Sequence, residues 1–378
     1  MVSPLTKPLR VVHIIPTLDQ GGAEKQLCLL SAHLDRARFE THVVVLTHSG
    51  PREVALREQG IPVHTINKSR KFDPHAYLRL KAKLLELRPD IVHTWLFAAN
   101  SYGRAAAYAA GVPVIIAGER CVDPWKSWWH LAVDRYLLKR TQAVATNTSA
   151  VTQFYAQRQL PIDKFVVIPN AVEPPEFVRL TRQQVFQRLG IEPRGKLVLA
   201  IGRLWAQKGY RDLIWSGELL HVAYSDVWLV IVGDGPQRSR LTHYRDQVCA
   251  FDSVRFAGQR TDAAELLSGA DVLWNGSLYE GQSNTLLEAM SLGVPAVATD
   301  IPGNRDLVDD AATGYLYKLG DVATLTRRTN YLLNNPQHAH MLGAAAAERA
   351  RQEFSVKLMV DRHAELYERL WRSASRIG

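Results

Sequence analysis

The chain has 378 residues, of which 47% are hydrophobic and 22% are charged, a composition typical of a globular protein with two domains. No apolar run reaches the roughly 18 residues that a membrane-spanning helix needs. The three cysteines, Cys28, Cys121 and Cys249, are too far apart in the sequence to form a paired metal motif, and we expect reduced thiols in a cytoplasmic protein.

Positive charge is concentrated in one half of the chain. Residues 1–170 hold 22 Lys and Arg against 13 Asp and Glu, whereas residues 171–378 hold 24 of each. The whole net charge of +9 therefore falls in the first half. A basic half suggests an anionic partner: a membrane surface, a phosphorylated acceptor or a nucleic acid. The alternative is that scattered basic residues only keep the surface soluble.

Short apolar segments alternate with segments of helical periodicity along the whole chain. Strands are predicted in the first half at 11–15, 41–46, 91–94, 112–116, 143–147 and 166–168. In the second half they are predicted at 197–201, 228–232, 254–256, 272–274 and 296–299. This alternation predicts an α/β protein with a doubly wound parallel sheet in each half, and the Pro-rich stretch 169–175 predicts the linker between them.

Ligands of such sheets bind at the carboxyl ends of strands, and glycines and charged residues follow several predicted strands. Gly21 and Gly22 follow the first strand and precede a helical run, so backbone N–H groups are available there. Ordinary turns also contain paired glycines. In the second half, Gly202, Arg203 and Lys208 follow the strand 197–201, and both cations could reach one diphosphate. The alternative is a loop with two solvated cations.

The segment from Glu280 to Glu288 is the most informative of the chain. Its two carboxylates flank a polar turn, and a helix is predicted over 285–292 with Ser283 or Asn284 as the N-cap and Gly293 as the stop. Free N–H groups at a helix start attract phosphates, while a carboxylate just inside the helix can accept hydrogen bonds from a ribose. The alternative is a solvated glutamate on a helix whose leucines are ordinary core.

Aromatic and basic residues occur together at 120–140, where Trp125, Trp128 and Trp129 lie among Lys126, Arg135, Lys139 and Arg140. This combination suits a membrane interface. Ordinary core packing and a platform for stacking sugars are the alternatives.

Taken together, these motifs resemble glycosyltransferase family 4, retaining enzymes of the GT-B fold. The matching segments are Gly-Gly-Ala-Glu at 21–24, Pro-Asp-Ile-Val-His at 89–93, Ile-Pro-Asn-Ala-Val at 168–172, Gly-Arg-Leu at 202–204 with Lys-Gly at 208–209, Gly-Asp-Gly-Pro at 233–236, Gly-x-Arg-x-Asp at 258–262, and Glu-Gly-x-x-Asn-x-x-x-Glu-Ala-Met at 280–290. They occur in the family's order and span nearly the whole chain. The resemblance implies two Rossmann-like domains facing across a cleft. An acceptor domain would be formed by 1–172 with a last helix at 354–372 that returns to it, so that the domain also takes in 354–378. A donor domain would be formed by 173–353.

The resemblance also implies roles for individual residues. Arg203 and Lys208 would bind the donor diphosphate and, with Glu280 beside the donor sugar, form the catalytic set, while Glu288 would hold the ribose. The other donor contacts would be Gly21, Gly22, Gly202, Gly281, Gln282, Ser283, Asn284 and, along the base, Arg260.

The chain departs from the family after the fifth strand of the first domain. Many members have a His there, near the donor sugar and the attacking hydroxyl, whereas this sequence reads Gly118-Glu119-Arg120. Glu119 or Arg120 would then contact the acceptor, and His93 is a further candidate, although a lone His at a strand end is more often a core residue. In a retaining front-face reaction the leaving phosphate oxygen can itself take the proton of the acceptor.

We therefore expect a retaining glycosyltransferase that uses a nucleotide-diphosphate sugar, with UDP commoner than GDP among similar sequences, and a hydroxyl acceptor in cell-envelope, polysaccharide or glycolipid synthesis. No Asp-x-Asp triplet occurs, so neither a metal nor another cofactor is expected. We expect a cytoplasmic protein, with peripheral contact to an anionic inner membrane face as an open question. The alternatives are a GT-B nucleotide-sugar epimerase, a non-catalytic binder of nucleotide sugars and, without any recognition motif, a nucleic-acid-binding protein.

Overall fold

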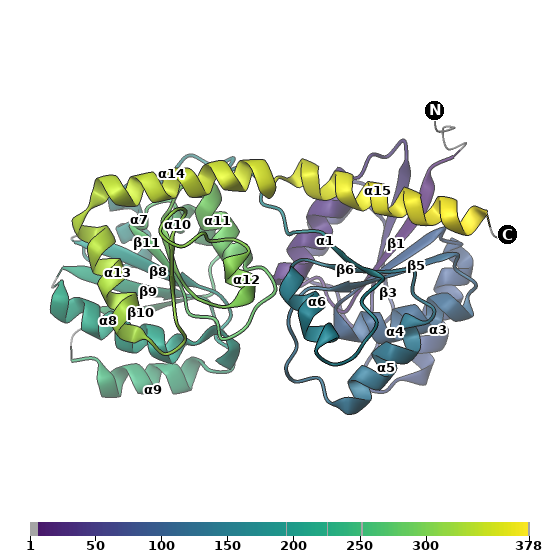
Figure 1. Ribbon diagram of the computed structural model, residues 1–378, viewed down its shortest axis with the longest axis horizontal. Coiled ribbons are helices and arrows are strands. Elements are labelled where there is room, and N and C mark those ends of the chain that lie inside the picture. The colour runs from purple at the N-terminus through teal and green to yellow at the C-terminus, as the bar shows by residue number, and fades with distance from the viewer. Residues whose placement is uncertain (1–6, 194, 225, 251, 377–378) are drawn as a thin grey trace. The chain divides into compact units, whose positions relative to one another are not determined.

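The computed structural model describes residues 7–193, 195–224, 226–250 and 252–376, and it divides the chain into two compact units (Figure 1). The first unit extends to Ala171 and resumes at Val356, and the second unit is Val172–Ser355. The first crossing from unit to unit therefore lies inside the Pro-rich stretch that was expected to be a linker.

The first unit is built on a seven-stranded parallel sheet with the strand order β3-β2-β1-β4-β5-β6-β7. Its strands are β1 (Leu9–Ile15), β2 (Phe39–Val45), β3 (Val63–Thr65), β4 (Ile91–Trp95), β5 (Val114–Glu119), β6 (Ala143–Thr146) and β7 (Phe165–Val167). Its helices are α1 (Gly22–His33), α2 (Arg52–Glu58), α3 (Pro74–Leu87), α4 (Leu96–Ala109), α5 (Trp128–Leu138), α6 (Ser149–Ala156) and α15 (Val356–Ser375).

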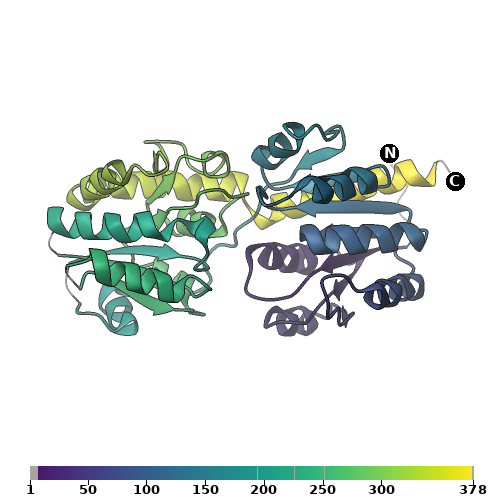
Figure 2. The same ribbon diagram turned by 90° about the horizontal axis from the view of Figure 1, so that it is seen from below.

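Alternate side chains of each strand pack into different cores, because helices cover both faces of the sheet (Figure 2). In β1, Leu9, Val11 and Ile15 belong to a core with α1 and α15, whereas Val12 and Ile14 belong to a core with α3 and α4. Strands that are buried on both faces are largely apolar, which is why they were recognisable as short apolar runs.

The second unit is built on a six-stranded parallel sheet with the order β10-β9-β8-β11-β12-β13. Its strands are β8 (Lys196–Ile201), β9 (Val227–Val232), β10 (Val254–Gly258), β11 (Val272–Asn275), β12 (Ala296–Thr299) and β13 (Tyr315–Tyr317). Its helices are α7 (Arg182–Leu189), the short 3-10 helix η1 (Ala206–Lys208), α8 (Tyr210–Ala223), α9 (Arg238–Val248), α10 (Ala263–Leu267), α11 (Asn284–Leu292), α12 (Pro302–Arg305), α13 (Val322–Asn334) and α14 (Pro336–Glu353).

The structure differs from the sequence predictions at a few elements. The edge strands β3 and β13 were not predicted. Strand β5 begins after Pro113, which lacks an N–H donor, and it extends to Glu119, so this residue ends the strand instead of starting the following loop. The final helix begins at Val356, two residues later than expected.

The strand order of each sheet reverses direction at its first strand. The reversal lies between β1 and β4 in the first unit and between β8 and β11 in the second. Ligands of open parallel sheets bind outside the carboxyl ends of the strands at this switch point. The segments that follow β8 and β11 contain Arg203, Lys208, Glu280 and Glu288.

Candidate functional site

The loops that follow β8 and β11 are fastened to each other. Gln207 Nε2 donates to the carbonyl of Tyr279 at 2.8 Å, and the Leu278 amide donates to the carbonyl of Gln207 at 2.8 Å. Gly209 has a φ of +61°, and a Cβ there would lie 2.0 Å from the carbonyl oxygen of Gly276. Only glycine fits this close approach, so the two loops form one edge of fixed geometry.

Lys208 and Glu280 are brought together at this edge. The ammonium of Lys208 forms an ion pair with Oε1 of Glu280, and Ser277 Oγ donates to the same carboxylate oxygen at 2.8 Å. Gln207 Nε2 lies 3.5 Å from the other oxygen, Oε2. Because Glu280 is buried, these contacts fix the direction in which its carboxylate points.

Arg203 lies at the same edge and is exposed. Its guanidinium carbon is 5.3 Å from the centre of the Trp205 ring, and Arg203 has no carboxylate partner among the described residues. Its donors therefore remain available to a ligand. The structure thus places two cations and one carboxylate at the switch point of the second sheet.

Helix α11 begins and ends as its sequence predicts. Ser283 is the N-cap, and its Oγ accepts from the Leu286 amide at 3.4 Å. Gly293 ends the helix in the left-handed region at φ +68°. Glu288 is half-buried just past the first turn, whereas Leu286 and Leu287 are core residues, as the plainer interpretation expected.

Three residues that support this loop were not predicted from the sequence. Asn275 donates to Ser283 Oγ at 3.0 Å and accepts from the Ser277 amide at 3.1 Å, so it ties the two ends of the loop together. Ser277 and Gln207 orient Glu280. The available signal was a polar residue at the end of the buried strand β11, Asn275, and a second one just beyond it, Ser277.

The remaining donor candidates have different surroundings. A Cβ at Gly303 would lie 1.9 Å from the carbonyl oxygen of Gly281, so α12 begins directly against the loop. The guanidinium of Arg260 is held in a fork by Asp262, with Nε–Oδ1 and Nη2–Oδ2 distances of 2.8 Å each. This hydrogen bonding lowers the pKa of Asp262. The side chain of Arg260 is therefore bonded within its own loop, to the neighbouring Asp262.

In the first unit, Gly21 and Gly22 lie at the start of α1, and the carboxylate of Glu24 packs against Gly21. A Cβ at Gly21 would lie 2.0 Å from Oε2 of Glu24, whose Oε1 is 3.4 Å from Thr17 Oγ1. A side chain at position 21 would displace Glu24.

His93 belongs to a buried aromatic cluster, and no part of its ring is exposed. Its Nδ1 lies 2.7 Å from the hydroxyl of Tyr367 on α15, and its ring stacks on Trp95 with centroids 4.7 Å apart. Burial, followed by the neighbouring His13 and His363, places the pKa of His93 well below its ordinary value. The structure therefore places His93 in the core of the first unit, the more common position for a lone strand-end histidine.

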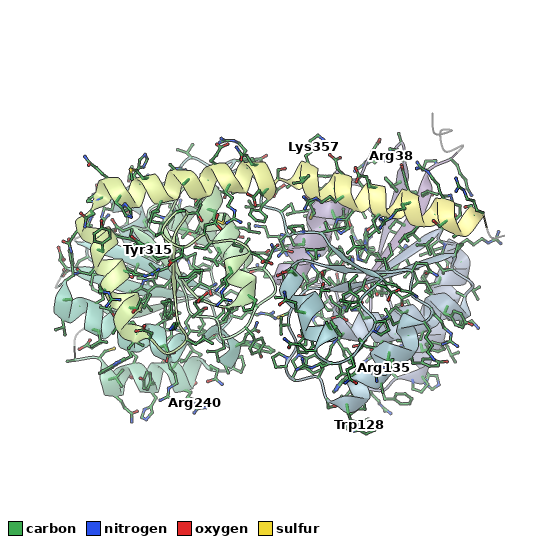
Figure 3. The ribbon with its side chains drawn as sticks, in the orientation of Figure 1. Arg38, Trp128, Arg135, Arg240, Tyr315 and Lys357 are labelled. Carbon is green, nitrogen blue, oxygen red and sulfur yellow. The ribbon has the colours of Figure 1, made fainter. Side chains whose placement is uncertain are left out.

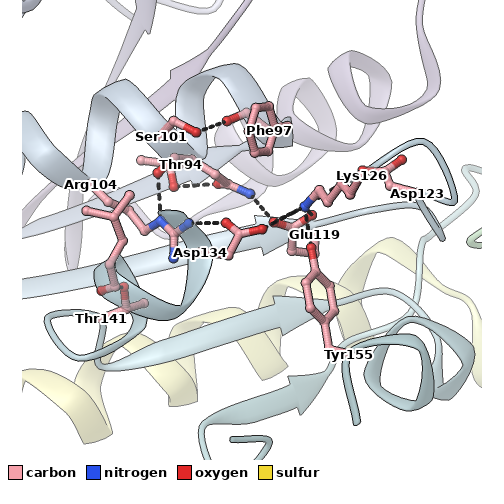
Figure 4. A network of polar contacts seen from close by, with 12 residues as sticks. Thr94, Phe97, Ser101, Arg104, Glu119, Asp123, Lys126, Asp134, Thr141 and Tyr155 are labelled. Carbon is pink, nitrogen blue, oxygen red and sulfur yellow. Dashed lines mark hydrogen bonds and ion pairs between the residues drawn. The ribbon is translucent and has the colours of Figure 1, made fainter. Parts of the chain in front are cut away.

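Glu119 lies within a buried charge network (Figure 4). Its carboxylate accepts from Asn100 Nδ2 at 2.8 Å and lies 3.3 Å from the ammonium of Lys126. Lys126 also pairs with Asp134 at 3.1 Å, and Asp134 pairs with Arg104 at 2.6 Å. The expectation that Lys126 adds to a basic surface is therefore wrong, because these buried carboxylates hold its side chain.

The tryptophans beside this network do lie at the surface. Trp128 is 81% exposed and Trp125 is 52% exposed. Trp125 packs edge-on against Phe97 with ring centroids 5.4 Å apart. Figure 3 shows Trp128 pointing outward from α5.

Within the described ranges, no helix is long and apolar enough to cross a membrane. Across the same residues, no three His, Cys, Asp or Glu side chains are placed to hold a metal ion.

Comparison with known proteins gives two family matches and extensive structural similarity. The model of Glycosyltransferase Family 4 matches residues 20–175, and that of Glycosyl transferases group 1 matches residues 181–349. A 2-deoxystreptamine N-acetyl-D-glucosaminyltransferase of Streptomyces fradiae is 31% identical over 285 residues, which cover 68% of this chain and 66% of that protein. The chain thus spans just under two-thirds of this relative.

A second relative and a solved structure match over more of their length. The UDP-Gal:alpha-D-GlcNAc-diphosphoundecaprenol alpha-1,3-galactosyltransferase of Escherichia coli is 26% identical over 312 residues. These cover 76% of this chain and 79% of that protein. Anabaena HepE, solved in complex with UDP-glucose, superposes with a TM-score of 0.85 at 22% identity, over 95% of this chain and 99% of that one. This likeness confirms the expected fold of two Rossmann-like domains.

Proposed function

Since the chain belongs to the group 1 glycosyl transferases of glycosyltransferase family 4 and has two Rossmann-like units of the GT-B type, we propose that it transfers a sugar from a nucleotide-diphosphate donor to a hydroxyl acceptor with retention of anomeric configuration. The observation that carries the proposal is the ion pair of Lys208 and Glu280 beside Arg203, at the switch point of the second sheet. A diphosphate needs cations there, and a sugar needs a fixed hydrogen-bond acceptor.

In the proposed reaction, Arg203 and Lys208 bind the diphosphate and stabilise the negative charge that develops on it as the bond to the sugar breaks. Glu280 lies beside the donor sugar, and Glu288 accepts hydrogen bonds from the ribose. The leaving phosphate oxygen takes the proton of the acceptor hydroxyl. Because the chain supplies its own cations, we propose that transfer needs no divalent metal.

For the donor, we propose a UDP-sugar. The Escherichia coli relative is named for its UDP-galactose substrate, and the Anabaena structure holds UDP-glucose. A thermal-shift panel of UDP- and GDP-sugars tests this choice, because a ligand that binds only the folded protein raises the apparent stability. A larger shift with GDP-sugars than with UDP-sugars would overturn it.

The decisive experiment is release of the nucleoside diphosphate with and without hydroxyl acceptors. We expect release that depends on the acceptor. Conversion of one UDP-sugar into another without any acceptor would instead identify an epimerase. Saturable donor binding without release, across soluble glycosides and lipid-linked saccharides, would identify a non-catalytic binder.

For the acceptor side, we propose that the first unit contacts an anionic membrane surface in the cytoplasm. With α15 included, this unit holds 27 Lys and Arg against 16 Asp and Glu, whereas the second unit holds 19 against 21. The exposed Trp125 and Trp128 would enter the interfacial region, and basic residues near lipid contribute about 1 kcal/mol each. The three cysteines are free thiols, which supports a cytoplasmic location.

A further inference from the structure

Three Lys or Arg side chains are buried in the described part of the chain, and one of them lacks a counter-ion. Arg104 pairs with Asp134 at 2.6 Å, and Lys126 pairs with Asp134 and Glu119 at 3.1 and 3.3 Å. Arg120 is 7% exposed and forms no ion pair with any described residue. A buried cation is normally paired, because an unpaired charge inside a protein is costly.

Arg120 is also short of hydrogen-bond acceptors. Its Nη2 donates to Oδ1 of Asn170, and its guanidinium carbon lies 5.1 Å from the centre of the Trp95 ring. Its Nε and Nη1 are buried and have no acceptor within the described chain. The aromatic face and one amide oxygen are neutral, so the charge of Arg120 is left uncompensated.

The position of Arg120 is that of a ligand-binding residue. It directly follows β5, Asn147 directly follows β6, and Asn170 follows β7, so the three come from the carboxyl ends of adjacent strands. Asn147 Nδ2 donates to the Arg120 carbonyl at 3.1 Å and to Oδ1 of Asn170 at 3.4 Å. The Oδ1 of Asn147 is buried without a donor, so it is suited to a hydroxyl group and not to an anion.

We propose that Arg120, positioned by Asn147 and Asn170, is the oxyanion-binding residue of the first unit, and that its ligand is a phosphate or carboxylate group of the sugar acceptor. An oxyanion would supply both the missing charge and the missing acceptors. The assignment to the acceptor rests on the proposed function, in which Arg203 and Lys208 of the second unit already serve the donor diphosphate.

The first test compares stabilities. An arginine with a structural role stabilises the fold. An arginine whose role is to bind a ligand lowers the stability of the protein when the ligand is absent. We expect Arg120→Met to unfold within about 2 °C of the wild type or above it, while the matched variant Arg104→Met, which breaks a buried ion pair, unfolds about 5 °C lower or more. Equal losses in the two variants would make Arg120 structural and overturn the proposal. Arg120→Gln serves as a second, polar replacement.

The second test measures binding of inorganic phosphate by calorimetry, at an ionic strength held constant with chloride. In the variant Arg203→Ala/Lys208→Ala, which lacks the proposed diphosphate cations, we expect phosphate binding to persist. Adding Arg120→Met or Arg120→Gln should weaken that binding by about tenfold or more, the effect of a lost charged hydrogen bond. Phosphate binding that ignores Arg120 would overturn the proposal.

Binding of UDP shows whether the anion belongs to the acceptor or to the donor. It also allows the proposed oxyanion site and the proposed function to fail separately. We expect Arg120→Met in the otherwise wild-type chain to bind UDP within about twofold of the wild type. A loss as large as that for phosphate would assign the anion to the donor and overturn the acceptor assignment. Absence of UDP binding to the wild type would contradict the proposed function, yet the dependence of phosphate binding on Arg120 would still be measured.

Discussion

Lys208 and Glu280 are 72 positions apart in the chain, yet the ammonium of one lies against the carboxylate of the other. The pair joins the loop after β8 to the loop after β11, the two strands that flank the switch point. Ser277 Oγ donates a hydrogen bond to the same carboxylate oxygen. A diphosphate that takes Lys208 as its counter-ion would leave Glu280 oriented by Ser277 and open to the hydroxyls of the sugar.

Removal of either proposed diphosphate cation should abolish most of the activity. We expect Arg203→Ala and Lys208→Ala each to lower turnover by about 10²- to 10³-fold, the usual effect of losing one group that stabilises developing charge. Thermal unfolding of Arg203→Ala should change little, because Arg203 is exposed. Lys208→Ala should also lower the unfolding temperature, because it removes the counter-ion of the buried Glu280. Arg240→Ala on α9, an exposed arginine in Figure 3, is the matched control and should keep full turnover. Normal turnover of both loop variants would refute the assignment.

The two glutamates should respond differently to free UDP. Glu288→Ala should lower the affinity for UDP about tenfold or more, because a charged hydrogen bond to the ribose is lost. Glu280→Ala should lower turnover strongly but leave UDP affinity intact, since Lys208 is then released from its ion pair. Calorimetric titration of both variants with UDP checks this. If both lose UDP affinity equally, the division of roles between sugar and ribose is wrong.

Chelation should leave transfer unchanged. Arg203 and Lys208 supply the positive charge that a metal ion would otherwise provide at the diphosphate, so we expect equal rates in EDTA and in Mg²⁺ or Mn²⁺. Rates are compared after dialysis of the enzyme against EDTA. Activity that disappears on dialysis and returns with either metal contradicts the prediction.

Acid should destabilise the first unit through its buried histidines. Burial, and then the neighbouring His363, lowers the pKa of His13 from 6.5 to about 3, and burial lowers that of His363 likewise to about 3. The unfolded chain therefore binds more protons than the folded chain between pH 6.5 and 3. The stabilisation is complete above pH 6.5 and falls on acidification by ~1.4 kcal/mol per pH unit for each histidine.

Denaturant unfolding from pH 7 to pH 4 measures this slope. His363→Leu removes one titrating group and should reduce the slope, whereas His75→Gln, at an exposed position on α3, should not. A slope that is the same in all three proteins would mean that these imidazoles do not govern acid stability.

Contact with a membrane should depend on both charge and tryptophan. We expect the chain to sediment with vesicles that contain anionic lipid at low salt and to be released at high salt. Trp128→Ser should weaken this binding, whereas Trp215→Ser, on α8 of the second unit, should not. Equal binding to neutral and anionic vesicles at low salt would remove the membrane from the proposal and favour a soluble acceptor.

Much of the fold was predictable because parallel strands buried on both faces appear in the sequence as short apolar runs. The strands β3 and β13 were missed because their sequences, Val-His-Thr and Tyr-Leu-Tyr, are short and are not aliphatic runs. The equally short edge strand β7, Phe-Val-Val, is apolar throughout and was predicted. The cap Ser283 and the stop Gly293 were predictable because local hydrogen bonds determine helix ends. Lys126 pairs with Glu119 and Asp134, which are seven and eight positions away on β5 and α5, and Arg120 contacts Asn170, which is 50 positions away. These contacts depend on how separate elements pack, so no local pattern could show that Lys126 is buried or that Arg120 lacks a counter-ion.

Helix α15 has a consequence for how the protein is made. Its residues Met359, Leu366 and Tyr367 complete the core around Leu9 and Phe39, yet the ribosome makes them after the whole second unit. The N-terminal strands and helices must therefore wait, with that apolar face uncovered, while about half of the chain is still being synthesised. The second unit is continuous in sequence and can close its own core first, so the order of folding is expected to be the reverse of the order of translation.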